Sequence, residues 1–142
     1  LLGARRMAIP AIEAMGDWLL DDVYVPRSAL ATAMLGIQDI AAARDVRICT
    51  FGHAGDGNLH PMIVTPRGDS EAAARGLLAF EDILDLALRV GGTITGEHGV
   101  GALKNAALTR ELDDVAASLH RRVKDAWDPA GILNPGKALP RW

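Results

Sequence analysis

The feature that most constrains the fold of this chain is the order in which short strand-like segments alternate with long amphipathic helices. Strand-like segments, rich in apolar and β-branched residues, lie at 18–25, 46–51, 58–64 and 93–95. Helical spacing of apolar residues follows the first segment and again the third. The order strand, helix, strand, strand, helix, strand is that of a ferredoxin-like sandwich. The sequence therefore predicts an α+β fold, with an antiparallel sheet that carries two helices on one face.

Capping residues and glycines indicate where the helices begin and end. Ser28 is expected to cap the first of these two helices, and Ser70 a longer one that ends at a pair of glycines. We further expect a helix over 1–15, with a kink or a break at Pro10. A last helix is expected over 111–127, because its apolar residues share one face.

Composition narrows the class of protein. With 142 residues, 49% of them hydrophobic, and a net charge of −3, the chain can bury a core and lacks the basic excess typical of nucleic-acid binding. Apolar runs stay short of the ~18 residues that span a membrane. The single cysteine, Cys49, excludes an internal disulfide and a cysteine-rich zinc site. We therefore expect one domain, no nucleic-acid partner and a cytoplasmic location.

Three of the four histidines fall in two glycine-rich turns. His53 and His60 lie in the turn between the second and third strands, and His98 follows Glu97 in the turn after the fourth. Glycines allow a backbone to approach a ligand closely or to adopt positive φ. Because one histidine ends a strand and the other begins the next, both imidazoles can reach the same point.

Glu97 would add a carboxylate oxygen to the nitrogens of His53 and His60. Such a set is a reasonable ligand group for Zn²⁺ or Mn²⁺ with positions open for substrate. The ion would polarise a hydroxyl or carboxylate oxygen, and His98 would serve as general base. By spacing alone, however, two histidines and a glutamate are more often unrelated loop residues. A phosphate-binding turn is a weaker alternative, because the Walker and dinucleotide spacings are absent.

Three strings of this chain together resemble one known family. They are FGHAGDGNLHP at 51–61, GGTITGEHGVGALK at 91–104 and DPAGILNPGK at 128–137. They are similar to the C-terminal half of FAD-linked oxidases of the vanillyl-alcohol oxidase type, which include the glycolate oxidase flavoprotein subunit, D-lactate dehydrogenase and D-2-hydroxyglutarate dehydrogenase. The likeness runs over about 4–137. Three motifs in the right order make it specific.

The resemblance implies a role for the three histidines and the glutamate of the two turns. His53, His60 and Glu97 would bind the divalent metal, Zn²⁺ or Mn²⁺. His98 would take the hydroxyl proton of the substrate while a hydride leaves for the flavin.

The resemblance also implies roles for other residues. Asn58 would contact substrate or flavin, and the string from Asn134 to Lys137 would return to the flavin ring. Arg5, in the first helix, would bind the substrate carboxylate. The alternative for this arginine is an ordinary solvated helix charge.

Two positions depart from the 2-hydroxyglutarate members of the family. If the aspartate of their first strand matches Asp22, Leu20 stands where they have a lysine, and Ile9 where they have a threonine. Both changes remove a polar contact for a second carboxylate. The departures therefore favour a smaller or more apolar 2-hydroxy acid, such as glycolate or lactate.

The family's FAD-binding pyrophosphate loop is absent from the chain, so we expect 1–142 to be the C-terminal substrate or cap domain, a fragment of a longer flavoenzyme. FAD would be bound mainly by an N-terminal FAD-binding domain. The parent would oxidise a D-2-hydroxy acid to a 2-oxo acid with hydride transfer to FAD, and pass electrons to an external acceptor. The isolated chain would be inactive, and a homodimer stays open.

Two functions of other classes also stay open at this point. One is a free-standing ferredoxin-like module that binds a metal or a small acid without redox activity. The other is a metal-dependent hydrolase in which Glu97 or His98 acts as the base.

Overall fold

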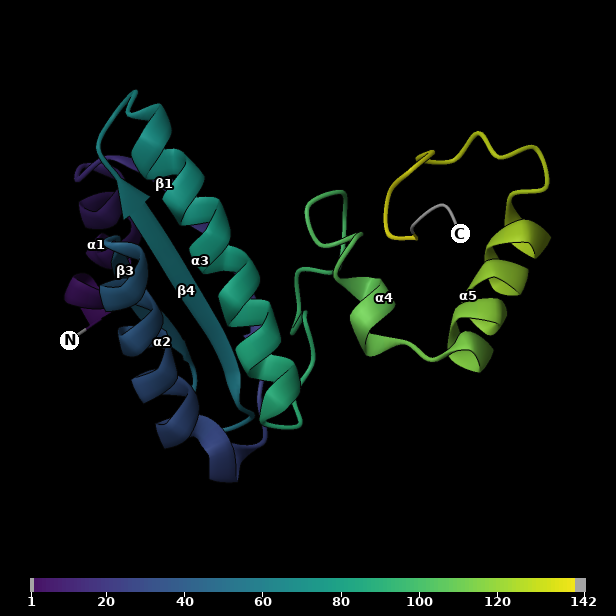
Figure 1. The fold of residues 1–142 in the computed structure, drawn as a ribbon, viewed down its shortest axis with the longest axis horizontal. Helices are drawn as coiled ribbons and strands as arrows, with labels where there is room; N and C mark the ends of the chain where they lie inside the picture. The colour runs from purple at the N-terminus through teal and green to yellow at the C-terminus, as the bar shows by residue number, and fades with distance from the viewer. Residues whose placement is uncertain (1, 140–142) are drawn as a thin grey trace.

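The computed structural model describes residues 2–139, and within this range it forms a four-stranded antiparallel sheet with helices on both sides and two further helices beyond it (Figure 1). The strands are β1 (Asp17–Leu20), β2 (Val23–Tyr24), β3 (Arg47–His53) and β4 (Asn58–Thr65). The helices are α1 (Leu2–Glu13), α2 (Leu30–Arg44), α3 (Ser70–Arg89), α4 (Leu108–Glu111) and α5 (Asp114–Trp127), and a 3-10 turn, η1 (Arg27–Ala29), precedes α2. The predicted α+β class is confirmed.

β4 is the central strand of the sheet. It pairs with β3 on one side and with β1 and β2, which follow one another along the same edge, on the other. Tyr24 of β2 makes an isolated antiparallel bridge with Thr93. This neighbour order is the ferredoxin-like one, with the fourth strand reduced to a single bridge.

The strand expected over 18–25 is interrupted at Asp21 and Asp22. The side chain of Asp21 accepts the backbone N–H of Asp22 at 2.8 Å, and the carboxylate of Asp22 accepts the N–H of Gly96 at 2.9 Å. Such side-chain bonds compete with the strand ladder. They divide the first strand into β1 and β2. The fourth predicted strand, 93–95, is represented by the single bridge at Thr93.

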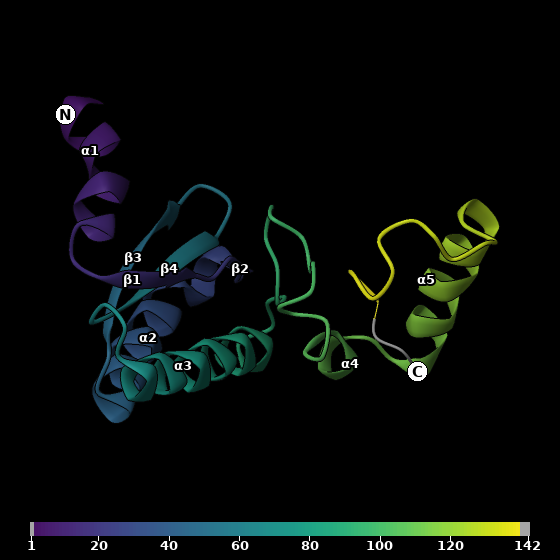
Figure 2. The same cartoon turned by 90° about the horizontal axis from the view of Figure 1, so that it is seen from above.

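The two faces of the sheet carry different helices (Figure 2). Leu59 and Ile63 of β4 pack in the larger core with α2 and α3, whereas Met62 and Val64 pack with Ile12 of α1 on the opposite face. This follows from the alternation of side chains along a strand. Two helices on one face are as predicted, and α1 occupies the other face. α1 also continues past Pro10 to Glu13, so the helix does not end at the proline.

Two helix caps differ from the prediction. α2 follows η1 and has Ala29 as N-cap without a side-chain bond, so the capping role expected of Ser28 is wrong. α3 is capped by Asp69, whose side chain accepts the N–H groups of Glu71 and Ala72. An aspartate also places negative charge at the positive end of the helix dipole, which makes it a strong N-cap.

The last predicted helix begins three residues later than expected. α4 ends at Glu111 and α5 begins after Asp113, whose side chain accepts the N–H of Ala116 at 2.7 Å. The apolar face of α5 has no buried residue: Val115, Leu119, Val123 and Trp127 are 53–82% exposed. Among residues 2–139, no helix is both long and apolar enough to cross a membrane.

The exposed apolar face of α5 predicts self-association of the isolated chain. Replacing Leu119 and Val123 together by glutamate is expected to weaken this association at least about tenfold, since burying each side chain is worth roughly 1.5–3 kcal/mol. Analytical ultracentrifugation over a concentration series measures it. Ser118→Glu, at an exposed polar position of the same helix, is the matched control. Equal association of the double variant and the unchanged chain would contradict the prediction.

Candidate functional site

The β3–β4 hairpin presents two histidines on the face of the sheet that α1 covers. Phe51 pairs with His60 across the hairpin, and His53 pairs with Asn58. Because alternate residues of a strand share a face, Phe51, His53 and His60 all point to the same side. The ring centroids of Phe51 and His60 lie 5.4 Å apart, as do those of His53 and His60.

The loop that carries Glu97 and His98 is held by the buried carboxylate of Asp22. The backbone N–H groups of Gly96, Glu97 and His98 donate to its Oδ2 at 2.9, 3.0 and 2.8 Å. The Oγ of Thr95 donates at 3.0 Å. Asp22, only 1% exposed, therefore anchors the whole loop to the break between β1 and β2.

Asp22 stays ionised in this position. Burial by itself would raise the pKa of its carboxyl group. The hydrogen bonds from the Asn58 side chain, from the backbone of His98 and Gly96, and from Thr95 outweigh burial and hold that pKa well below its usual range. A permanent charge is thus available to hold the loop.

A glycine is required at position 96. A Cβ built there would lie 1.7 Å from Nδ2 of Asn58 and 2.8 Å from Oδ1 of Asp22. The glycine therefore lets the loop backbone approach the aspartate closely enough to donate to it.

His53, His60 and Glu97 meet at one point. Oε1 of Glu97 lies 3.2 Å from Nε2 of His60 and 3.5 Å from Nε2 of His53. All three ligand atoms lie within 4.8 Å of one another. Ligands of a tetrahedral zinc ion with bonds of about 2.0–2.1 Å are separated by about 3.3 Å. The donor set and its spacing therefore fit a divalent cation, and the structure brings the three predicted side chains together.

His60 is the buried member of this group, at 5% exposure. Burial lowers the pKa of its imidazole, although the charge of Asp22 opposes that shift. Its Nδ1 lies 3.6 Å from Oδ1 of Asp22, which is too long for a hydrogen bond, and has no such partner among the described residues. The neutral imidazole that burial favours is the form that ligates metals.

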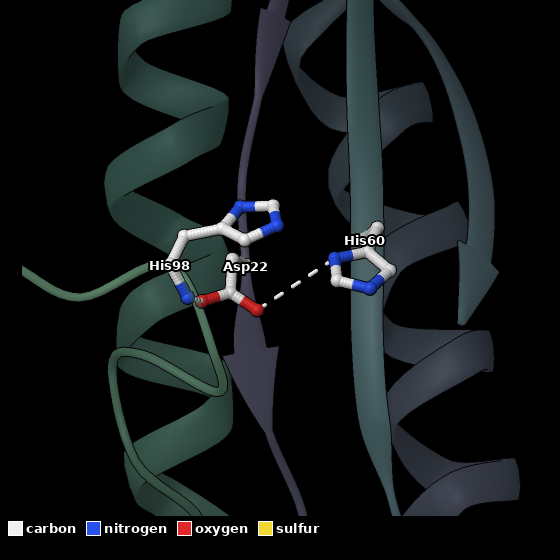
Figure 3. A group of neighbouring side chains, drawn as sticks. All are labelled: Asp22, His60 and His98. Atoms are coloured by element: carbon white, nitrogen blue, oxygen red, sulfur yellow. Dashed lines mark hydrogen bonds and ion pairs between the residues drawn. The ribbon is translucent and has the colours of Figure 1, made fainter. Parts of the chain in front are cut away.

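His98 lies beside His60 at the open side of the site. Their rings stack with centroids 5.1 Å apart and planes 17° from parallel, and Nε2 of His98 is 3.8 Å from Oε1 of Glu97. Asp22, His60 and His98 form a second group with metal-ligand spacing (Figure 3). The oxygens of Asp22, however, already accept several hydrogen bonds. The group containing Glu97, whose carboxylate is exposed, is therefore the better cation site.

A cavity of about 430 Å³ opens over these side chains. His53, His60, Glu97 and His98 line its polar part. The remaining wall is apolar and includes Ile9 of α1, Leu20 of β1 and Phe51 of β3. The two positions that depart from the 2-hydroxyglutarate members of the resembled family thus lie in the same wall. This volume suits a small organic molecule.

The predicted roles of Arg5 and Asn58 depend on where their side chains lie. Arg5 belongs to α1, but its side chain lies outside the described residues. Asn58 is buried, and its Nδ2 donates to Oδ1 of Asp22 at 2.7 Å and to the carbonyl of Val23 at 3.3 Å. Its Oδ1 has no hydrogen-bond partner in the described part of the chain.

Asn134 and Lys137 are exposed in the loop that follows α5. Asn105 ties this loop down by donating to the carbonyl of Gly136 at 2.9 Å. Neither Asn134 nor Lys137 lines the histidine cavity as the structure describes it over 2–139.

The sequence did not identify Asp22 as the anchor of the loop, nor the buried ion pair behind it, in which Nζ of Lys104 lies 2.8 Å from Oδ1 of Asp21. Asp22 served only as a reference position, and Asp21 and Lys104 had no role. A signal was present, because two consecutive aspartates interrupt the apolar run 18–25, where a buried charge needs a partner. What the sequence did not show is which residue supplies that partner.

Comparison with known proteins identifies the class of protein to which this α+β domain and its histidine-lined cavity belong. Residues 1–138 match the family described as FAD linked oxidases, C-terminal domain. The chain belongs to this family, and the resemblance in its three motifs is confirmed.

Individual relatives carry names of hydroxy-acid oxidoreductases. Over 142 residues the chain is 46% identical to the glycolate oxidase subunit GlcD of Bacillus subtilis (strain 168), covering 99% of the chain and 30% of that protein. It is 36% identical over 137 residues to GlcD of Escherichia coli (strain K12), covering 96% and 28%. It is 40% identical over 138 residues to a D-lactate dehydrogenase of Anaerostipes hadrus, covering 94% and 28%. The chain thus spans less than a third of the length of these curated relatives.

Proposed function

We propose that this chain is the substrate-binding and metal-binding part of a flavoenzyme that oxidises a small D-2-hydroxy acid, of the glycolate or D-lactate type, to the 2-oxo acid with hydride transfer to FAD. The observation that carries the proposal is the meeting of His53, His60 and Glu97 in one cavity, with His98 beside them. The names of the relatives support the substrate class.

In this reaction the chain's own residues bind the acid and move one proton. His53, His60 and Glu97 would hold a Zn²⁺ or Mn²⁺ ion, which when bound polarises the substrate oxygen. His98 accepts the hydroxyl proton at a ring nitrogen as the carbon–oxygen double bond forms and the hydride leaves the same carbon. Arg5 would pair with the substrate carboxylate.

The flavin is the second group that this proposal requires. FAD, held mainly by an N-terminal FAD-binding domain, supplies the hydride acceptor when bound. Asn58, whose Oδ1 has no hydrogen-bond partner among residues 2–139, is proposed to contact the flavin or the substrate, as are Asn134 and Lys137. Electrons then pass to an external acceptor. A cytoplasmic location is part of the proposal.

The cavity wall supports a small substrate. Ile9 and Leu20 place apolar groups where a second carboxylate would need a polar partner. Burying an unpaired carboxylate there costs more than the loss of a methylene contact. Glycolate or D-lactate is therefore the preferred class over D-2-hydroxyglutarate.

The test is steady-state and stopped-flow kinetics of the full-length flavin-loaded protein that contains this chain. Glycolate or D-lactate is expected to bleach the flavin band and reduce a dye, with kcat/KM at least about tenfold above that for D-2-hydroxyglutarate. The isolated chain, lacking a pyrophosphate-binding loop, is expected to be colourless and inactive. Failure of both acids to reduce the flavin would overturn the proposal and favour a binding module or a hydrolase. Stoichiometric FAD binding by the chain alone would overturn the assignment of FAD binding to a separate N-terminal domain.

A further inference from the structure

A buried lysine lies directly behind the loop that carries Glu97 and His98. Lys104 is 5% exposed, and its ammonium contacts Oδ1 of Asp21 at 2.8 Å. It also donates to the carbonyl of Ile94 at 2.7 Å and to the carbonyl of Asp22. An ammonium has three donors, and here each has an acceptor. All three acceptors lie either in the break between β1 and β2 or at the start of the site loop.

Stability by itself does not explain this pair. Both side chains are almost fully buried, and burial raises the pKa of Asp21 to about 6 although Lys104 lowers it. Exchanging a buried ion pair for apolar residues of similar volume is often neutral or stabilising. A buried ammonium with three acceptors does, however, fix local geometry. Each acceptor must stay in place, because an unpaired buried charge is costly.

The contacts lead from Lys104 to the site in two steps. Lys104 holds the backbone of Asp22, and the carboxylate of Asp22 binds the N–H groups of Gly96, Glu97 and His98. Lys104 also donates to the carbonyl of Ile94, which lies two residues before Gly96. The loop is thus tied to the sheet at its start and along its length.

We propose that Lys104, paired with Asp21, is a positioning residue of this site, which fixes the loop that presents Glu97 and His98. Lys104 is not among the residues that line the cavity over the described range, so it acts through Asp22 and Ile94. The functional consequence rests on the proposed function, whereas the placement of the loop does not.

Hydrogen exchange in the full-length protein tests the placement. Lys104→Met keeps the apolar stem and removes the ammonium. The double variant Asp21→Leu with Lys104→Met removes both charges, so that the protein folds without an unpaired buried carboxylate. In both, the amides of Gly96, Glu97 and His98 are expected to exchange at least about tenfold faster, while amides of the α3 core, such as those of Ala79 and Leu84, keep their rates.

Lys124→Met is the matched control, since Lys124 also joins a carboxylate, Oδ2 of Asp128 at 2.5 Å, and a carbonyl, that of Leu133 at 2.6 Å, but on α5. It should leave exchange at 96–98 unchanged. Unchanged exchange there in the double variant, or equal acceleration in the α3 core, would overturn the positioning role.

A second measurement separates this inference from the proposed function. The affinity for added Mn²⁺ is expected to fall about tenfold or more in the double variant, because Glu97 would no longer be held in place; losing a group that orients a metal ligand typically costs about 10–100-fold. If the unchanged protein binds no Mn²⁺ and oxidises no hydroxy acid, the proposed function fails, and the exchange rates still decide the role of Lys104. If Mn²⁺ binds equally well with and without the pair, the positioning role is overturned.

Discussion

Replacing His98, the proposed general base, by glutamine in the full-length protein that contains this chain is expected to lower kcat for glycolate or D-lactate by about 10²–10⁴, the range for loss of a general base. The side chain is exposed at the cavity and stacks on His60, so it contributes little to the core. Flavin content and the melting temperature should therefore be retained. Single-turnover bleaching of the flavin measures the effect on the chemical step directly.

His120 provides the matched control for this substitution. It is an exposed histidine on α5, whose Nδ1 lies 2.8 Å from the carbonyl of Ala116, and it is remote from the cavity residues in sequence. His120→Gln should leave kcat and KM unchanged. Near-normal turnover in His98→Gln would show that another group accepts the proton.

The second large effect is expected at the proposed cation site. Glu97→Gln preserves shape but removes the charge nearest to His53 and His60, and it should weaken Mn²⁺ or Zn²⁺ binding by about 100-fold or more. Because Glu97 is exposed, the fold should survive the change. Titration calorimetry of the chelator-treated protein measures the affinity. Turnover lost on chelation should return when the metal is added back.

The pH dependence of metal binding follows from His60. Its pKa lies below the ordinary value of 6.5 because the ring is buried, so this ligand remains deprotonated to lower pH than an exposed histidine. The control for the loss of charge in Glu97→Gln is Glu71→Gln, which makes the same change at an exposed position in the first turn of α3. Equal affinities of Glu97→Gln and the unchanged protein would contradict the assignment of this carboxylate as a ligand.

Local patterns in the sequence predict a large part of this architecture. The apolar and β-branched content of 46–51 and 58–64 predicts two strands, and the glycine-rich turn between them brings His53 and His60 close together. Only residues near one another in the chain are needed for that inference, since a hairpin sets its own register. The sandwich order follows in the same way from the succession of strands and helices.

The sequence by itself determined the α+β class, the hairpin and its histidines, because these depend on periodicity and on turn residues close together along the chain. Tertiary structure alone decided that Asp22 crosses more than seventy residues of sequence to bind the backbone of Gly96, Glu97 and His98, and that Lys104 neutralises Asp21. Tertiary structure also decided that α1 covers the histidine face. A buried charge must find a partner, but its identity depends on which segments the fold brings together, and no local pattern encodes that distance.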